Sequence, residues 1–421
     1  MKKLAKLFIK TAAALVALLA LLIGGRILVG WIVAPEPRPV DQTEGALRAR
    51  ALALHREALV LDGHNDLPTW ILDFGFDLGM DGDEASDRSP LLYAGLTWLP
   101  DPPRGDGVRT HTDLARIREG GLDAQFFAIW PACSYAKTPG QSRQRVLDMI
   151  ESFRRQVGTH PEAIEMAASA EDVERIVGGE KIAALLGVEG GHAIEGDLEN
   201  LAVFHRLGVR YMTLNHSCSH AWADSSTDEP ISNGLSGFGR EVVREMNRLG
   251  MIVDVSHVSD ATFRDVLEVS AAPVIASHSC ARAIADHPRN LSDEMIRSLA
   301  AKGGVAMVNF STSYLDPAKT SFLKVGLGWH WFWHPRGTAT PLSILVDHID
   351  HMVAVGGIDH VGLGSDFDGV PWLPEGLEDV GDLPNITLEL LRRGYSDGDV
   401  RKVLGGNAMR VLREVEAAAA L

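Results

Sequence analysis

The chain has few cysteines and lacks the short motifs of several enzyme classes. Only three of its 421 residues are cysteine, and Cys133, Cys218 and Cys280 show no C-x-x-C spacing. Three thiols allow at most one bridge within the chain, so at least one is free or pairs elsewhere. There is no H-E-x-x-H motif and no glycine-rich phosphate loop with its lysine, which argues against a helical zinc-protease site and a P-loop nucleotide site.

One match to a serine-hydrolase motif also fails. Residues 394–398 fit G-x-S-x-G, but no apolar strand leads into them as the strand-to-helix turn of such enzymes requires. Ser396 with Asp399 three residues later instead predicts the start of a helix.

Basic residues are outnumbered by acidic residues outside the N-terminus. The net charge is −16, yet residues 1–35 carry five basic residues and no acid, which leaves 35 bases against 56 acids in the remainder. A body of this charge repels phosphate backbones, so we expect no nucleic-acid partner.

The N-terminal 35 residues have the pattern of a targeting segment. Four lysines precede an apolar run from Thr11 to Gly25, and a second run follows Arg26. Together the two runs reach the length of a membrane span, whereas the first alone suits a cleaved signal peptide. No clean A-x-A cleavage site follows, which favours an uncleaved anchor. We expect residues 1–35 to export the chain, 36–57 to form a tether and leading helix, and 58–421 to form one catalytic domain.

Eight apolar runs of β type follow, with helical patterns between most of them. The expected strands are Ala58–His64, Leu122–Trp130, Ile182–Glu189, Val209–Asn215, Met251–His257, Pro273–His278, Gly304–Phe310 and His360–Asp366. The expected helices are Glu44–Arg56, Ser142–Val157, Leu198–Leu207, Gly239–Leu249, Asp260–Glu268, Asp293–Ala301 and Leu342–Val355. This alternation predicts a (β/α)8 TIM-type barrel, with an open doubly wound sheet as the alternative. Two long connections, Thr69–Leu114 and Ser311–Thr340, would lie at the barrel mouth, the second bearing Trp329, Trp331 and Trp333.

Residues of metal-ligand type stand at the ends of these strands. They are His64, Asp66, Glu189, His257, His278 and Asp366, and His216 directly follows a further strand. Each alone is more simply explained as a hydrogen-bonded core residue or a turn former. A barrel gathers its strand ends around one mouth, however, so together they predict one site. Three histidines and three carboxylates exceed the needs of one tetrahedral zinc and suit two ions that share a carboxylate.

With these residues in view, residues 60–414 resemble the membrane (renal-type) dipeptidase family of zinc peptidases. The motifs that carry the resemblance are Asp62-Gly63-His64-Asn65-Asp66, Gly187-Val188-Glu189-Gly190-Gly191-His192, Thr213-Leu214-Asn215-His216-Ser217-Cys218, Asp254-Val255-Ser256-His257, Ser277-His278-Ser279 and Gly364-Ser365-Asp366-Phe367-Asp368-Gly369. Their order and spacing match the family throughout.

The resemblance implies a role for each strand-end residue. His64 and Asp66 would hold one Zn²⁺, His257 and His278 a second, and Glu189 with a water or hydroxide would bridge the two. The bridging water would attack the peptide carbonyl. Asp366 would pass its proton to the leaving amine, and His216 would bind the substrate and stabilise the oxyanion.

Further roles also come from the resemblance alone. Arg289 would pair with the free carboxylate of the dipeptide, a role that suits the planar guanidinium. Tyr314 falls where the family places a substrate-binding tyrosine. Cys133 and Cys218 fall where family members form a disulfide, which would leave Cys280 free. The resemblance also implies a homodimer.

The sequence departs from the animal enzymes of the family at both ends. The N-terminal apolar segment replaces their lipid-anchored C-terminus, since the tail Ala417–Leu421 is too short for an anchor signal. We therefore expect a bacterial inner-membrane protein with its catalytic domain in the periplasm, or a secreted one if the segment is cleaved. Because family members accept a C-terminal D-residue, cell-wall-type dipeptides join the expected substrates. Two alternatives remain: a metal-dependent amidohydrolase acting on N-acyl amino acids or lactams, and a catalytically idle metal-binding or scaffolding protein.

Overall fold

The structure is a computed structural model that describes residues 42–80, 110–319 and 339–419. The N-terminal segment 1–35 and the three tryptophans at 329–333 lie outside these ranges. From Arg50 onward the described residues form one compact unit. Within the described ranges, no helix combines the length and apolar character needed to cross a bilayer.

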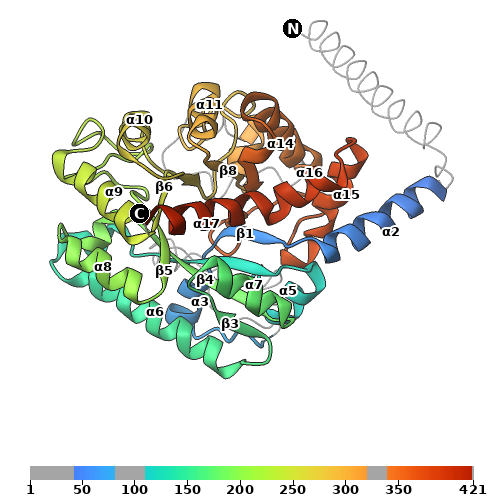
Figure 1. Cartoon of the computed structure of the whole chain (residues 1–421), viewed down its shortest axis with the longest axis horizontal. Coiled ribbons are helices and arrows are strands. Elements are labelled where there is room, and N and C mark those ends of the chain that lie inside the picture. The colour runs from blue at the N-terminus through green and yellow to red at the C-terminus, as the bar shows by residue number, and fades with distance from the viewer. Residues whose placement is uncertain (1–41, 81–109, 320–338, 420–421) are drawn as a thin grey trace, which may run out of the picture. The chain divides into compact units, whose positions relative to one another are not determined.

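Parallel strands form a closed barrel in the described part of the chain (Figure 1). The strands are β1 (Leu61–Asn65), β2 (Ala124–Ile129), β3 (Ile164–Met166), β4 (Ile182–Glu189), β5 (Val209–Thr213), β6 (Ile252–Asp254), β7 (Ile275–Ala276), β8 (Val305–Val308) and β9 (Val361–Leu363). The order β2-β1-β9-β8-β7-β6-β5-β4 is closed by pairing of β2 with β4 along six residues of each strand. Closure confirms the expected (β/α)8 barrel and rules out the open sheet.

Strand β3 is additional to the eight barrel strands. It pairs with Ile182, Ala183 and Ala184 at the start of β4, whereas Leu186 to Glu189 pair with β5. Three residues are too short to give a period-2 signal, so this strand was not expected from the sequence.

Helices surround the barrel (Figure 1). The helices of the described residues are α2 (Gln42–Glu57), α3 (Leu67–Phe74), α5 (Leu114–Gly120), α6 (Gln141–Thr159), α7 (Ala170–Gly178), α8 (Leu198–Arg206), α9 (Gly237–Leu249), α10 (Asp260–Val269), α11 (Asp293–Ala301), α12 (Thr312–Leu315), α14 (Leu342–Gly356), α15 (Pro384–Arg392), α16 (Asp397–Arg401) and α17 (Asn407–Ala419). The seven expected helices all form. Helices α8 to α11 each begin after an Asp or Ser side chain that accepts a backbone N–H of the first turn. The expected cap at Ser396 also forms and begins α16.

Helix α17 lies across the strands and covers the end of the barrel at which they begin (Figure 1). Its Met409 and Leu412 belong to one buried cluster with Leu61, Ala124 and Val305, which stand at the starts of β1, β2 and β8. Because this end is filled with apolar side chains, the opposite end, where the strands finish, is left for polar chemistry.

Candidate metal centre

Glu189, the last residue of β4, lies between three imidazole rings. Its Oε1 is 3.0 Å from Nε2 of His257 and 3.4 Å from Nε2 of His278. Its Oε2 is 3.7 Å from Nε2 of His64. The two oxygens of one carboxylate thus face different imidazole nitrogens, an arrangement that suits a carboxylate shared by two ions.

Two further carboxylates lie on the His64 side of the group. Oδ2 of Asp66 is 3.5 Å from Nε2 of His64. Asp366 brings an oxygen within 4.8 Å of ligand atoms of both residues. Its Oδ2 also accepts a hydrogen bond of 2.7 Å from Nδ2 of Asn309. His64, Asp66 and Asp366 are all buried. By its position Asp366 could serve either as a ligand or as a proton carrier.

The donor atoms of this group fit a divalent cation. Nε2 of His64 is buried without a hydrogen-bond partner among the described residues. Nε2 of His257 and Nε2 of His278 are 2.9 Å apart. Two imidazole nitrogens so close compete for one proton, whereas a cation attracts both lone pairs. Imidazole with carboxylate is the donor set that zinc commonly takes in proteins.

The electrostatics also favour a cation. Burial raises the pKa of Glu189 well above its usual value, and the charges of Asp66 and Asp366 raise it further. Burial likewise raises the pKa of Asp366 to about 7. At His64 burial lowers the pKa, but the carboxylates of Glu189 and Asp66 outweigh it and raise the value to about 10. Three buried acids face one imidazolium and the guanidinium of Arg289, so they are still short of positive charge, which a divalent ion would supply.

Two residues of the site, His257 and Asp366, have a left-handed backbone conformation that orients their side chains. His257 has φ of 68° and Asp366 φ of 62°, in the left-handed region that non-glycine residues rarely adopt. Such strain is tolerated where the surroundings fix the conformation, commonly at functional sites. Sequence patterns do not reveal it.

Residues beneath the site hold the ligands in place. The hydroxyl of Tyr211 is 2.8 Å from Nδ1 of His64. A Cβ at Gly187 would lie 2.1 Å from the Tyr211 ring, so this glycine makes room for it. Asp62 accepts the N–H and the hydroxyl of Ser365, which joins β1 to the segment that carries Asp366.

Arg289 lies beside the metal-ligand group. Its side chain is buried, and Nη2 donates to the backbone carbonyl of His278 at 3.2 Å. Its Nε and Nη1 have no hydrogen-bond partner within the described ranges. The guanidinium lies 5.5 Å from the centre of the Tyr314 ring, so the two expected substrate-binding residues are neighbours.

His216 also reaches the group. Its ring lies 4.6 Å from that of His257 and meets the Trp130 ring edge-on at 5.2 Å. Burial and the charge of Arg289 lower the pKa of His216 to about 3. The ring is therefore neutral near pH 7 and able to donate one hydrogen bond.

Cys133 and Cys218 form a disulfide with Cα atoms 6.2 Å apart, as the resemblance implied. The bridge joins the connections after β2 and β5, and so links the segments that carry Trp130 and His216. Cys280 is free and buried.

Several supporting residues were not singled out from the sequence: Tyr211, Asn309, Asp254 and Ser277. Asp254 and Ser277 stand inside motifs that the sequence did single out, beside histidines of interest. Their hydrogen bonds join separate strands, however, and nothing in the local pattern reveals such partners.

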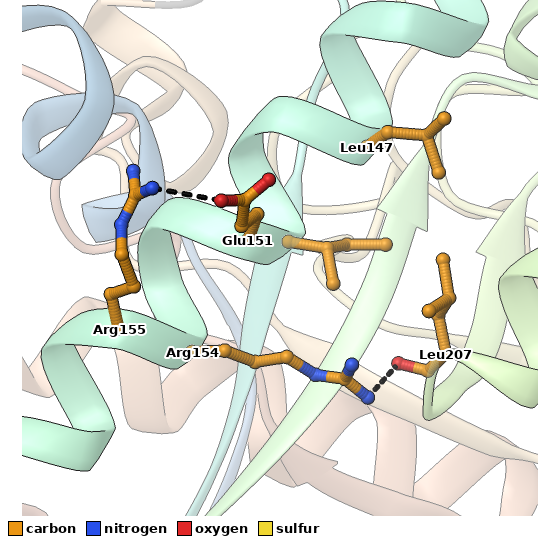
Figure 2. A pocket seen from close by; sticks show the side chains of 6 residues that line it. Leu147, Glu151, Arg154, Arg155 and Leu207 are labelled. Atoms are coloured by element: carbon orange, nitrogen blue, oxygen red, sulfur yellow. Dashed lines mark hydrogen bonds and ion pairs between the residues drawn. The ribbon is translucent and has the colours of Figure 1, made fainter.

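A separate groove of about 430 Å³ lies along α6, away from these residues; Figure 2 shows its lining. The lining residues are Leu147, Ile150, Glu151, Arg154, Arg155 and Leu207. Arg155 pairs with Glu151, and Arg154 donates to the carbonyl of Leu207 (Figure 2). With a single, already paired carboxylate and no histidine, this groove does not resemble a metal centre.

Comparison with known proteins gives one consistent family. Residues 48–421 match the family model described as membrane dipeptidase (peptidase family M19). Dipeptidase 3 of Mus musculus is 37% identical over 376 residues, covering 88% of this chain and 67% of that protein. Dipeptidase tcpJ of Claviceps purpurea (strain 20.1) is 40% identical over 319 residues, covering 74% of this chain and 70% of that protein.

Solved structures agree. The probable dipeptidase PvdM from Pseudomonas aeruginosa has a TM-score of 0.74 at 29% identity, covering 89% of this chain and 99% of its own. A metallopeptidase from Rhodobacter sphaeroides, liganded with a phosphinate mimic of the dipeptide L-Ala-D-Ala, has a TM-score of 0.69 at 27% identity. The match covers 85% of this chain and 99% of that one.

Proposed function

Because this chain belongs to the membrane dipeptidase family, we propose that it hydrolyses free dipeptides at a zinc centre formed by the strand-end residues. Membership makes it a metal-dependent dipeptidase. The observation that carries the proposal for this chain's own residues is the position of Glu189. Its two oxygens face His257 and His278 on one side and His64 on the other.

In the proposed site His64 and Asp66 would hold one zinc, His257 and His278 would hold the other, and Glu189 would be shared. Zinc bound there would lower the pKa of water to give a nucleophile at neutral pH and would polarise the peptide carbonyl. Asp366, oriented by Asn309, carries a proton to the leaving amine. Neutral His216 donates a hydrogen bond to the developing oxyanion.

Arg289 provides the selection for dipeptides. A buried guanidinium beside the metal ligands, with two nitrogens unpaired among the described residues, matches a carboxylate one residue beyond the scissile bond. Tyr314 would flank that carboxylate. Since the Rhodobacter sphaeroides peptidase binds a mimic of L-Ala-D-Ala, we include dipeptides with a C-terminal D-residue among the substrates.

The cell location and assembly form the remaining part of the proposal. Residues 1–35 would anchor the chain in a bacterial inner membrane with the catalytic domain in the periplasm, where the disulfide is stable. If the segment is cleaved, the protein is secreted. The resemblance supports a homodimer.

The test measures metal content and activity on one preparation of the full chain in detergent. Zinc is counted per chain while hydrolysis is followed on L-L and L-D dipeptides, N-acyl amino acids and lactams, with and without chelator. Two zincs with chelator-sensitive dipeptide cleavage are expected. Two zincs with cleavage only of N-acyl amino acids or lactams would favour the amidohydrolase alternative, and metal without any turnover would favour an idle metal-binding protein.

A further inference from the structure

Asp254, the last residue of β6, is buried and accepts four hydrogen bonds. Its Oδ1 accepts the backbone N–H groups of Ser256 at 3.0 Å and Ser277 at 2.8 Å. Its Oδ2 accepts the hydroxyls of Thr213 at 2.5 Å and Ser277 at 2.6 Å. Both oxygens are fully engaged by protein donors, so Asp254 is not free to bind a metal although it stands three residues before His257.

The Ser277 hydroxyl has two neighbours besides Asp254: the Ser256 hydroxyl at 3.4 Å and, closer, an imidazole nitrogen. Its Oγ is 2.8 Å from Nδ1 of His278. A hydroxyl has one proton to donate, and a buried carboxylate is a stronger acceptor than a neutral imidazole nitrogen. The proton therefore goes to Asp254. The contact with His278 then requires that Nδ1 carries a hydrogen and donates it to Oγ of Ser277.

This arrangement decides which nitrogen of His278 can bind metal. With the hydrogen on Nδ1, the lone pair of Nε2 points toward Oε1 of Glu189 and Nε2 of His257. We propose that Asp254, acting through Ser277, is a positioning residue that fixes His278 in the tautomer that binds metal through Nε2. The inference rests on the proposed binuclear site.

The other two candidate histidine ligands are held differently. Nδ1 of His64 contacts the hydroxyl of Tyr211. Nδ1 of His257 has no hydrogen-bond partner among the described residues. Since His257 and His278 would share one ion, that ion depends most on the control exerted through Ser277. Partners of this kind are worth about 10- to 100-fold in metal affinity.

The informative substitution is Asp254→Asn, which keeps the shape of the side chain. Its Oδ1 can still accept the two backbone N–H groups, but Nδ2 then points at the hydroxyls of Thr213 and Ser277 as a donor. The proton of Ser277 is released toward Nδ1 of His278. The imidazole hydrogen moves to Nε2 and blocks the metal position. Ser277→Ala removes the same connection without altering Asp254.

Thr213→Val is the matched control, because it removes the other hydroxyl on the same Asp254 oxygen and does not touch His278. Zinc affinity is measured for the full chain in detergent by competition with a chromogenic chelator. We expect wild type and Thr213→Val to keep two zincs with equal affinity. Asp254→Asn and Ser277→Ala should bind one of the two about 10- to 100-fold more weakly.

The inference would be overturned if Ser277→Ala bound zinc as tightly as wild type. It would also be overturned if Ser277→Ala and Thr213→Val lost affinity to the same extent. This pair decides the question even if Asp254→Asn does not fold. Failure of the proposed function would be a different result. A wild-type chain that holds two zincs but cleaves no dipeptide would refute the activity and leave the affinity comparison intact.

Discussion

At the scale of single residues, the two carboxylates beside His64 differ in how they are held. Asp66 contacts Nε2 of His64, whereas Asp366 receives a hydrogen bond from Asn309 at 2.7 Å. An oxygen already engaged by an amide has less capacity for a metal, which favours the proposed role of Asp366 as a proton carrier over a role as a ligand.

Asp366→Asn should therefore keep both zincs and lose most turnover, because an amide cannot carry the proton. General acid–base catalysis contributes about 10²- to 10⁴-fold, and kcat should fall by that amount. Zinc per chain and kcat are measured on the same preparation. Loss of one zinc would make Asp366 a ligand, and near-normal turnover would contradict the role of proton carrier.

Arg289→Ala should affect substrates according to their C-terminal group. Hydrogen bonds to charged groups contribute about 1.5–3 kcal/mol, so kcat/KM for free dipeptides should fall about 10- to 150-fold. The matching dipeptide amides lack the carboxylate and should lose far less. The measurement is kcat/KM for each substrate pair with both enzymes. Equal losses on acids and amides would refute carboxylate recognition.

Gly369→Ala should disturb the metal centre through sterics alone. A Cβ at Gly369 would lie 2.0 Å from Oδ2 of Asp66 and 2.7 Å from Oδ1 of Asp366. Asp66 must move away, and zinc affinity should fall by at least tenfold, the size of effect that displaced ligand support produces. Gly398→Ala is the control, since the nearest atom to its added Cβ is 3.7 Å away. Unchanged zinc affinity in Gly369→Ala would mean that Asp66 is not a ligand.

The sequence could predict candidate ligands but not what holds them. His64, Glu189 and His278 are recognisable because each follows an apolar run that must be a buried strand. Asp254 and Tyr211 act through hydrogen bonds to other strands, which only the closed barrel brings near. Arg289 follows no strand, and only the family resemblance pointed to it.

At the scale of elements, strand positions were predictable and strand lengths were not. The run Pro273–His278 is apolar at its start, yet β7 has only the two residues Ile275 and Ala276. The residues that follow turn toward the site, where the backbone N–H groups of Ser277 and His278 donate to the side chains of Asp254 and Ser256 rather than along the sheet. Apolar character reports burial, and burial continues beyond the end of the paired strand.

Helices that cover the strand starts were harder to foresee. Helix α17 lies in an alanine-rich tail with no distinct helix stop, so its pattern carries little information in isolation. Its buried face packs against the starts of the strands, and these contacts exist only in the folded barrel. Gly405, just before α17, lies close to the start of β1. A Cβ at this position would be 2.5 Å from the carbonyl oxygen of Leu59, so a glycine is needed for this close approach.

The disulfide links two elements that do not pair with each other. Strands β2 and β5 lie on opposite sides of β4, and the bridge connects the segments after them across 85 residues of sequence. Replacing both Cys133 and Cys218 by serine should lower the free energy of unfolding by about 2–5 kcal/mol, since a long loop in the unfolded chain is released.

That loss is measured by urea unfolding under oxidising conditions. Wild type treated with a thiol reductant should fall to the stability of the double variant, and the variant should not respond to the reductant. A wild-type protein that stays equally stable after complete reduction would show that the bridge contributes little.

At the scale of the whole molecule, charge is separated along the chain. The first 35 residues carry five of the 40 basic residues and none of the 56 acidic ones. An acidic body is repelled by anionic lipid headgroups, so the proposed membrane attachment would depend on a segment that inserts. The apolar runs on either side of Arg26 are the stretch suited to that role.

We therefore expect the full chain to sediment with membranes and to be released by detergent but not by high salt, which would remove a merely electrostatic attachment. A version in which a cleavable signal peptide replaces residues 1–35 should be soluble in the periplasm with the same kcat/KM. The mass of the purified full chain decides between anchor and signal, because an intact anchor keeps 45.6 kDa and cleavage gives a lighter chain. An intact chain in the soluble fraction would contradict the anchor, since an uncleaved apolar segment of this length has no other favourable place than a bilayer.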